Sequence, residues 1–397
     1  MKVKYVLLFW ISAYCNAQSP EQVLQWINTA KADNLNFYYE IPFEYKGNEI
    51  VVPITIGNQK YDYIFDTGGY NCITDAIQEK NNFPVLTTQT VGSSNKIKSK
   101  INIVKVDSLT FGGLVFRDIA TLQMDFSKSP TIRCIIDGGI IGASIIKDYI
   151  WQIDYPNRKI IVTDQKEKLP GLEQAMRVPV TFNNRLMPFI DMKIGGKTEK
   201  VLFDLGSATA FSMTKKTAKR YHKSKDVILI KGGSTEGANG TIQEDIHLFK
   251  ASAIGIGALE YKNKPVYYTN SNNENLIGNP IIKNYIVTLN FKENELLFLP
   301  IKETLVEEGW RSFGFTFDYK EDTIKVATLY EGLFAEKAGL RLNDTVISID
   351  GKAVDCKNEC ECKKALAEEL EQKEMLRLTV IRNNTTLDIM VKKERVF

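Results

Sequence analysis

Short runs in which hydrophobic and polar residues alternate fill most of the chain between residues 42 and 301. The segments 109–116 and 254–261 show the pattern, with apolar positions alternating with polar or small ones around a glycine turn. A period of two predicts strands that bury one face, and the 3.6-residue period of an amphipathic helix is rare in this stretch. The chain is therefore predicted to be mainly β and to form small β-barrels.

Helical patterns flank the β-rich region. Ser19 and Pro20 precede apolar residues at helical spacing, which predicts a short capped helix in the N-terminal segment 18–41. A longer helix is predicted from about Asn358 to Gln372, and two strands follow it around a turn at residues 383–384.

Two stretches of the β-rich region repeat in register. In each, an Ile-Gly pair is followed, nine positions after its glycine, by an aspartate that ends an apolar run; the aspartates are Asp66 and Asp204. Further along, residues 141–150 and 277–286 are identical at seven of ten positions. Such a repeat at matched spacing indicates two related β-rich units.

The repeat defines a first unit, residues 42–168, and a second unit, residues 178–301. The polar, turn-rich stretch 166–177 suits the boundary between them.

The charge balance excludes some classes of partner. Lys and Arg number 51 against 48 Asp and Glu, so the net charge is only +3, and no strongly basic tract offers a surface for nucleic acid. The two histidines, His222 and His247, have no neighbouring cysteine that would complete a usual zinc site. We therefore expect no metal, no cofactor and no nucleic acid.

The N-terminus indicates export. Two lysines precede a short apolar run, and Cys15-Asn16-Ala17 fits signal-peptidase cleavage before Gln18, so residues 1–17 are predicted to be a signal peptide. A lipid anchor on Cys15 is the less favoured alternative, because Tyr14 is a poor residue before a lipidated cysteine. The apolar run is too short to span a bilayer, so no membrane span is predicted. We expect a periplasmic or extracellular protein.

An exported chain meets an oxidising compartment, which favours disulfides. Cys72 and Cys134 are predicted to pair within the first unit, and two of Cys356, Cys360 and Cys362 near the C-terminus, which leaves one thiol over. Metal binding by the C-terminal cluster is the minor alternative, since a fourth ligand is missing.

Each repeated aspartate opens an Asp-x-Gly triplet, Asp66-Thr67-Gly68 and Asp204-Leu205-Gly206, and each later segment contains a hydrophobic-hydrophobic-Gly element. In these features residues 42–301 resemble the pepsin-like and retropepsin-like aspartic proteases. The resemblance implies two acid-protease β-barrel lobes related by a pseudo-twofold axis. Their two aspartates would share one proton and activate a water molecule for peptide hydrolysis. A third triplet, at Asp137, lacks the shared context and is expected to be a turn.

The resemblance also assigns roles to neighbouring residues. Gly68 and Gly206 leave room for the carboxylates to approach each other. The Thr67 hydroxyl is expected to form hydrogen bonds across the two loops. Leu205 stands where the family has Thr or Ser, so the hydrogen bonding between the loops is expected to be asymmetric. Ser207 matches a family serine that bonds the outer oxygen of the second aspartate.

Closure of the cleft is predicted from both sides. The turns at residues 92–95 and 232–240 are the candidate flaps that would exclude water, and a pepsin-like flap tyrosine has no counterpart between Pro84 and Lys105. This pattern favours a retropepsin-like, two-sided closure.

The C-terminal region, residues 310–397, resembles a bacterial-type PDZ domain. Its markers are Ala338-Gly339-Leu340 and the succession from Asn343-Asp344 to Asp350-Gly351-Lys352. PDZ domains bind a chain end by strand addition. Phe313-Gly314-Phe315 would then be the loop that donates amides to the terminal carboxylate; alternatively, Phe313 and Phe315 are core residues of a strand.

Together these features predict a monomeric, exported aspartic endopeptidase with an appended small α+β PDZ domain. Its partners would be a peptide or protein substrate and a C-terminal peptide at the PDZ domain. A catalytically inactive peptide-binding or scaffold protein is the alternative, and the hydroxyl missing at Leu205 favours it.

Overall fold

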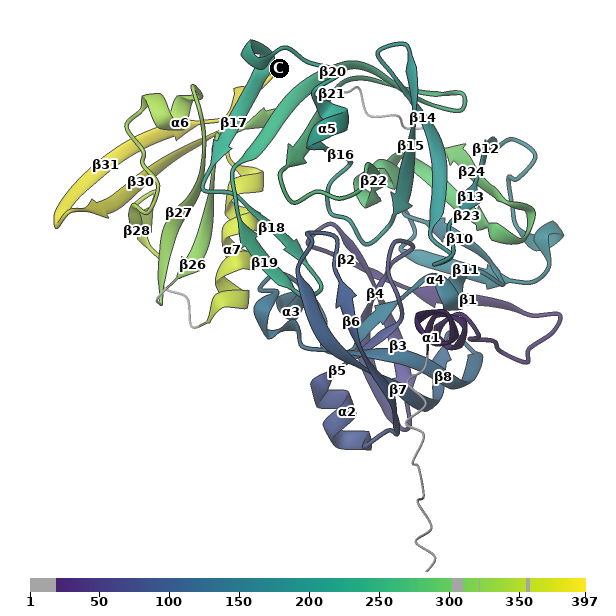
Figure 1. Cartoon of the computed structure of the whole chain (residues 1–397). Coiled ribbons are helices and arrows are strands. Elements are labelled where there is room, and N and C mark those ends of the chain that lie inside the picture. The colour runs from purple at the N-terminus through teal and green to yellow at the C-terminus, as the bar shows by residue number, and fades with distance from the viewer. Residues whose placement is uncertain (1–18, 302–309, 321, 355–357) are drawn as a thin grey trace, which may run out of the picture.

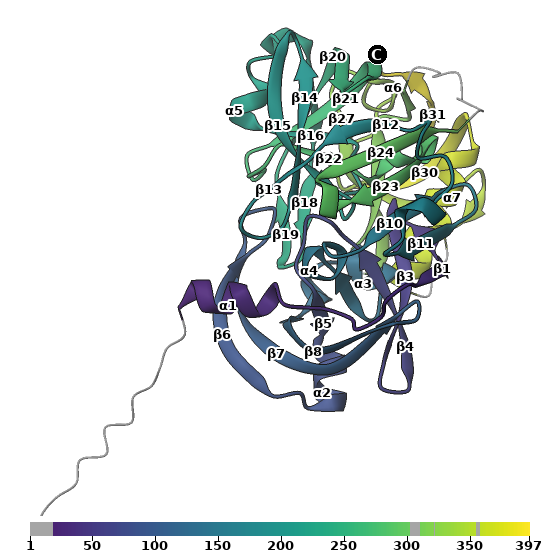
Figure 2. The same ribbon diagram turned by 90° about the vertical axis from the view of Figure 1, so that its right-hand side faces the viewer.

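The computed structural model describes residues 19–301, 310–320, 322–354 and 358–397. The predicted signal peptide, residues 1–17, lies outside the described residues. The prediction of a mainly β chain that contains β-barrel sheets and a PDZ domain is confirmed. Figures 1 and 2 show the β-rich units packed together and the PDZ strands attached at one side.

The first unit is an eight-stranded sheet with strand order β2-β3-β4-β9-β5-β8-β7-β6. A further pairing between β3 and β7 places Thr55 opposite Thr110 and closes the sheet on itself. Because alternate residues of these strands are buried, one face of the closed sheet forms an apolar core. The strands are β2 (Glu44–Lys46), β3 (Glu49–Ile56), β4 (Gln59–Phe65), β5 (Cys72–Thr74), β6 (Val85–Gly92), β7 (Lys98–Phe111), β8 (Leu114–Met124) and β9 (Gly139–Ile141). The helices are α2 (Asp75–Asn81), η1 (Phe126–Lys128), α3 (Ile132–Ile135) and α4 (Ala143–Ile146).

The second unit repeats this arrangement. Its strands follow the order β13-β14-β15-β22-β16-β21-β20-β17, and a further pairing of β14 with β20 closes the sheet. The strands are β13 (Thr181–Phe182), β14 (Pro188–Ile194), β15 (Lys197–Asp204), β16 (Phe211–Thr214), β17 (Val227–Lys231), β20 (Ile246–Ile256), β21 (Leu259–Thr269) and β22 (Leu276–Gly278). A separate hairpin consists of β18 (Ser234–Gly237) and β19 (Gly240–Gln243), and the helices are α5 (Lys215–Ala218), η3 (Ser224–Asp226), η4 (Asn279–Asn284) and η5 (Phe291–Glu293).

The sequence repeat corresponds to a repeat of strand pairing. In the first unit β4 runs parallel to β9, with Phe65 opposite Ile141, and in the second unit β15 runs parallel to β22, with Phe203 opposite Ile277. In both units the strand that follows the aspartate loop pairs antiparallel with the later strand. Each aspartate therefore occupies the same place in its unit.

A six-stranded sheet with order β1-β11-β10-β23-β24-β12 connects the two units. Its central pair, β10 and β23, brings Gln152 opposite Thr288, and the Gln152 side chain donates a hydrogen bond to the Thr288 hydroxyl at 3.1 Å. The largest apolar cluster includes buried residues of both units and of this sheet. The strands are β1 (Tyr38–Pro42), β10 (Ile150–Asp154), β11 (Lys159–Thr163), β12 (Met176–Pro179), β23 (Tyr285–Asn290) and β24 (Glu295–Pro300), and η2 (Lys166–Lys168) lies after β11.

The predicted N-terminal helix is present as α1 (Pro20–Ile27). The Ser19 side chain accepts a hydrogen bond from the Gln22 amide, and the Gln22 side chain accepts one from the Ser19 amide, so the helix begins with a capping box. Its buried face carries Val23 and Ile27, which pack into a cluster of the first unit, and the helix contacts β8.

The PDZ domain has its own apolar core and is joined to the second unit by strand pairing. Ile230 of β17 lies opposite Tyr330 of β27, so the PDZ strands continue the sheet of the second unit. The predicted long helix is confirmed as α7. The elements are β25 (Arg311–Ser312), β26 (Phe315–Lys320), β27 (Thr323–Tyr330), α6 (Phe334–Lys337), β28 (Thr345–Ile349), β29 (Lys352–Ala353), α7 (Glu359–Gln372), β30 (Met375–Arg382), β31 (Thr385–Lys392) and β32 (Glu394–Arg395).

The predicted pairing of Cys72 with Cys134 is wrong. Cys134, on α3 of the first unit, forms a disulfide with Cys360 on α7 of the PDZ domain. Cys72 is a free, buried thiol, because it lies in β5 inside the barrel, away from the surface where α3 meets α7. Cys362 is also disulfide-bonded, and Cys356 lies outside the described residues.

Candidate active site

The loops that follow β4 and β15 bring the two repeated aspartates together. Asp66 follows the buried end of β4, and its amide donates a hydrogen bond to the Ile141 carbonyl at 2.9 Å. Asp204 is the last residue of β15 and lies opposite Gly278 in the parallel pairing. Asp66 is 9% exposed and Asp204 is half-buried, so both carboxyl groups lie at the edge of the core.

Each loop packs its glycine against the aspartate of the other loop. A Cβ atom at Gly68 would lie 2.5 Å from Cγ of Asp204, and a Cβ atom at Gly206 would lie 2.3 Å from Cγ of Asp66. Real Cβ atoms do not approach other atoms so closely, so only glycine fits at either position. The reciprocal packing places the two carboxyl groups close enough for each to change the pKa of the other.

The two carboxyl groups have different surroundings. Burial raises the pKa of Asp66, but backbone amides of Gly68, Gly69 and Gly206 donate hydrogen bonds to it and oppose the rise. The Gly68 bond is 2.6 Å long. Burial and then the negative charge of Asp66 hold the pKa of Asp204 well above the ordinary aspartate value. Of the two carboxyl groups, Asp204 therefore has the stronger tendency to hold a proton, whereas hydrogen bonds favour the ionised form of Asp66.

Thr67 bonds across the two loops, as the resemblance implies. Its hydroxyl donates a hydrogen bond to the Phe203 carbonyl at 2.5 Å and accepts one from the Leu205 amide at 3.0 Å. The Thr67 side chain is fully buried, so these bonds are shielded from water. One hydroxyl thus fixes the backbone on both sides of Asp204.

Leu205 has no hydroxyl and is fully buried in the apolar cluster shared by the two units. Its carbonyl accepts a hydrogen bond from the Asn279 side chain at 3.0 Å, which supports the second loop from within its own unit. Hydrogen bonding by hydroxyls between the two loops is therefore asymmetric, as predicted. The expected bond from Ser207 to Asp204 is absent among the described contacts, because the Ser207 hydroxyl bonds locally to the Thr209 backbone.

Glu49 is a candidate site residue that the sequence analysis missed. It begins β3, is 8% exposed, and its Oε2 atom has no hydrogen-bond partner among the described residues. Burial and the charges of Asp66 and Asp204 hold its pKa well above the ordinary glutamate value. A third buried carboxyl group therefore lies near enough to the pair to interact with its charge. The available signal was a lone acid at the start of the apolar run from Glu49 to Ile56.

The two predicted flap turns meet between the units. The Asn95 side chain, at the tip of the β6–β7 hairpin, donates hydrogen bonds to the carbonyls of Thr235 and Gly240 at 2.9 and 2.8 Å. In return, the Asn239 side chain, at the tip of the β18–β19 hairpin, donates to the backbone of the first unit at Val91 and Ile97. Figure 1 shows the β18–β19 hairpin extending from the second unit to β6.

The predicted PDZ carboxylate loop has a left-handed residue at its centre. Gly314 has a φ of 79°, and its amide donates a hydrogen bond to the Ser312 hydroxyl at 3.0 Å. Phe313 and Phe315 are buried in the PDZ core, so their side chains stabilise the domain. A peptide carboxylate at this loop would have to replace Ser312 as the acceptor.

The strand next to this loop has a free edge in the described part of the chain. β26 pairs only with β27, and α7 lies beside its other edge. The Lys363 ammonium on α7 lies 3.5 Å from an oxygen of Asp318 on β26, so an ion pair crosses the groove in which a PDZ domain adds a strand.

Comparison with known families identifies one part of the chain. Residues 312–392 match the PDZ domain family. This match indicates peptide or protein binding by the C-terminal domain. No curated protein matches the chain. Within the described ranges, none of the helices combines the length and the apolar character that crossing a bilayer requires.

Proposed function

We propose that the chain is an exported aspartic endopeptidase whose PDZ domain assists the binding of a substrate or partner. The observation that carries the proposal is the reciprocal packing of Gly68 on Asp204 and of Gly206 on Asp66. This packing brings the two carboxyl groups close enough together to share one proton. Aspartates that served only to form turns would not require a glycine of the opposite loop to pack against each carboxyl group.

The chemistry follows from the two environments. Ionised Asp66 accepts a proton from a water molecule held between the carboxyl groups, and the resulting hydroxide attacks the peptide carbonyl carbon. Asp204 donates its proton toward the carbonyl oxygen, which stabilises the developing negative charge. The proton on Asp66 then passes to the leaving nitrogen as the C–N bond breaks, and Asp204 takes back a proton from a hydroxyl of the tetrahedral intermediate as the carbonyl re-forms, which restores the starting state of the pair. Neither a metal ion nor a covalent intermediate is required in this scheme.

The test compares the full chain with the variants Asp66→Asn and Asp204→Asn on a mixed peptide library, with fragments identified by mass spectrometry. Each variant should lose at least a thousand-fold in hydrolysis rate, since each carboxyl has a separate proton-transfer role. Asp137→Asn is the matched control: Asp137 belongs to the third Asp-x-Gly triplet, and its carboxylate accepts a hydrogen bond from the backbone amide of Asp62 in β4. The control should hydrolyse peptides at close to the native rate.

Two outcomes would contradict the proposal. Fragments formed at the native rate by Asp66→Asn or Asp204→Asn would exclude the pair from the chemistry. A native chain that retains peptides without cleaving them, and whose retention is unaffected by pepstatin, would favour the peptide-binding or scaffold alternative.

A further inference from the structure

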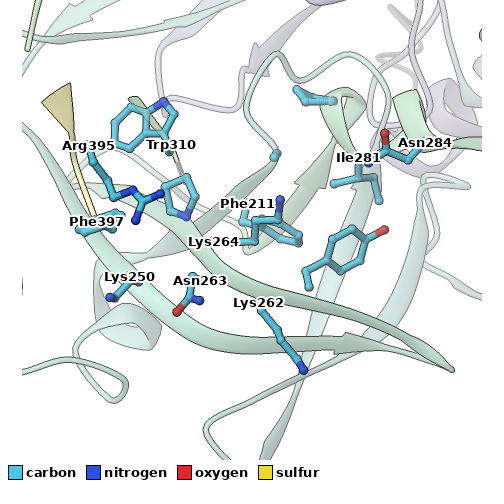
Figure 3. A pocket seen from close by; sticks show the side chains of 14 residues that line it. Phe211, Lys250, Lys262, Asn263, Lys264, Ile281, Asn284, Trp310, Arg395 and Phe397 are labelled. Atoms are coloured by element: carbon cyan, nitrogen blue, oxygen red, sulfur yellow. The ribbon is translucent and has the colours of Figure 1, made fainter. Parts of the chain in front are cut away.

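A cavity of about 810 Å³ lies between the second unit and the PDZ domain, and neither Asp66 nor Asp204 is among its described lining residues. Its walls come from β16, β20, β21 and η4 of the second unit and from Trp310 and the C-terminal residues of the PDZ domain. Figure 3 shows side chains from both domains directed toward the same space. This volume is within the range of about 300–1,000 Å³ that is common for small-molecule sites.

The interior of the cavity is apolar. The second unit contributes the buried side chains of Phe211 and Ile281, and the PDZ domain contributes the half-buried residues Trp310 and Phe397. The Trp310 and Phe397 rings lie 6.1 Å apart between centroids and form one aromatic wall. Such a surface favours an apolar chain or ring over water.

Four cationic side chains are among the described residues that line the cavity. Lys250, Lys262, Lys264 and Arg395 line it, and none of the described lining residues is acidic. Lys262 has a solvent-exposed partner, Glu260, at 3.8 Å. Neither Lys250 nor Arg395 has a carboxylate within ion-pair distance among the described residues; Lys250 instead lies 6.0 Å from the centre of the Phe397 ring. The net charge of the whole chain is only +3, so the cations at this cavity do not reflect a generally basic protein.

An extended peptide fits this site poorly. The outer edge of β21 borders the cavity, but Asn263 has a φ of 52° and Pro265 has no amide to donate. A left-handed residue and a proline at a sheet edge disfavour the addition of another strand there. The cavity therefore suits a ligand that binds through apolar contact and charge rather than through backbone pairing.

We propose that this cavity binds a fatty-acid anion, with the acyl chain against Phe211, Ile281 and Trp310 and the carboxylate at Lys250 and Arg395. The apolar interior accounts for the chain, and the cationic side chains of Lys250 and Arg395 account for the carboxylate. The site is independent of the proposed hydrolysis, so it can be tested without any substrate.

The experiment is calorimetric titration of the full chain with dodecanoate below its micellar concentration. Dodecanoate should bind with a stoichiometry of one, while dodecyltrimethylammonium, which has the same chain and the opposite charge, should bind at least ten-fold more weakly. The double variant Lys250→Gln with Arg395→Gln should weaken dodecanoate binding at least five-fold. The matched control Lys337→Gln removes an exposed lysine of α6 outside the cavity and should leave the affinity unchanged.

Hydrogen exchange would locate the ligand. Bound dodecanoate should slow amide exchange in residues 261–266 and 280–284, which line or adjoin the cavity, and leave α2 unaffected. Equal binding of the cationic amphiphile, unchanged affinity in the double variant, or binding of many molecules per chain would each overturn the proposal.

Discussion

The Thr67 hydroxyl offers the sharpest test of how the two loops are held together. Thr67→Val keeps the shape of the side chain and removes the hydroxyl. The Phe203 carbonyl then loses a donor and the Leu205 amide loses an acceptor, at a position that is fully buried. An unsatisfied buried polar group costs about 1–3 kcal/mol, so the expected loss in the free energy of unfolding is about 2–6 kcal/mol.

The assay is urea unfolding of the full chain, followed by tryptophan fluorescence. At a slope of about 3 kcal/mol per molar urea, the transition should move to lower urea by roughly 0.7–2 M. Thr328→Val is the control, because its hydroxyl pairs with that of Thr316 at an exposed site, where a loss below about 0.5 kcal/mol is expected. Thr67→Ser keeps a hydroxyl and should recover most of the loss. An unchanged transition in Thr67→Val would refute the cross-loop role of this residue.

Three further expectations concern the pair, the disulfide and the hairpins. The rate of peptide hydrolysis should fall at low pH as Asp66 becomes protonated and at high pH as Asp204 ionises. Because both pKa values are raised, the pH profile of kcat/KM should be centred above the ordinary aspartate range. A profile centred below that range would contradict the assignment. The stability that protonated Asp204 contributes is complete below the ordinary carboxyl pKa and is lost as pH rises toward its raised native pKa. Replacing Cys134 and Cys360 by serine should lower stability by about 2–4 kcal/mol in thermal unfolding without reductant, and no change would mean that the covalent link is redundant. Asn95→Ala should speed proteolytic cleavage at the hairpin tips about ten-fold, since two buried carbonyl contacts are lost, whereas equal cleavage rates would argue against the contact between the hairpins.

Much of the candidate site could be predicted from sequence because its information is local. An apolar run, an aspartate and a glycine two positions later recur at the same spacing in each unit, and the same local pattern produced the same strand end and the same turn. The positions of Asp66 and Asp204 at matched places therefore followed from the repeat. The cross-loop bonds of Thr67 were also expected, since the resemblance supplied a role for a hydroxyl at that position.

Features that depend on contacts distant in sequence could not be predicted in this way. The Cys134–Cys360 disulfide joins residues 226 positions apart, and its formation depends on how the PDZ domain docks on the first unit. The local Ser207 turn was preferred over a bond to Asp204, because an adjacent backbone amide is a nearer partner than the carboxylate. Glu49 was missed for a similar reason, since its proximity to the pair arises only when the barrel closes.

The PDZ domain is joined to both β-rich units, and these two connections limit how far the units can separate. Strand pairing of β17 with β27 joins it to the second unit, and the Cys134–Cys360 disulfide joins it to the first. The segment of α3 that carries Cys134 also contacts the β18–β19 hairpin, because Glu236 of β18 accepts hydrogen bonds from the amides of Thr131 and Ile132. The disulfide is covalent, whereas the pairing of β17 with β27 rests on two residue pairs. A motion that parts the hairpins must therefore be absorbed at that short pairing or within the β6–β7 and β18–β19 hairpins. The tips of these hairpins contact each other through hydrogen bonds from the Asn95 and Asn239 side chains to backbone carbonyls.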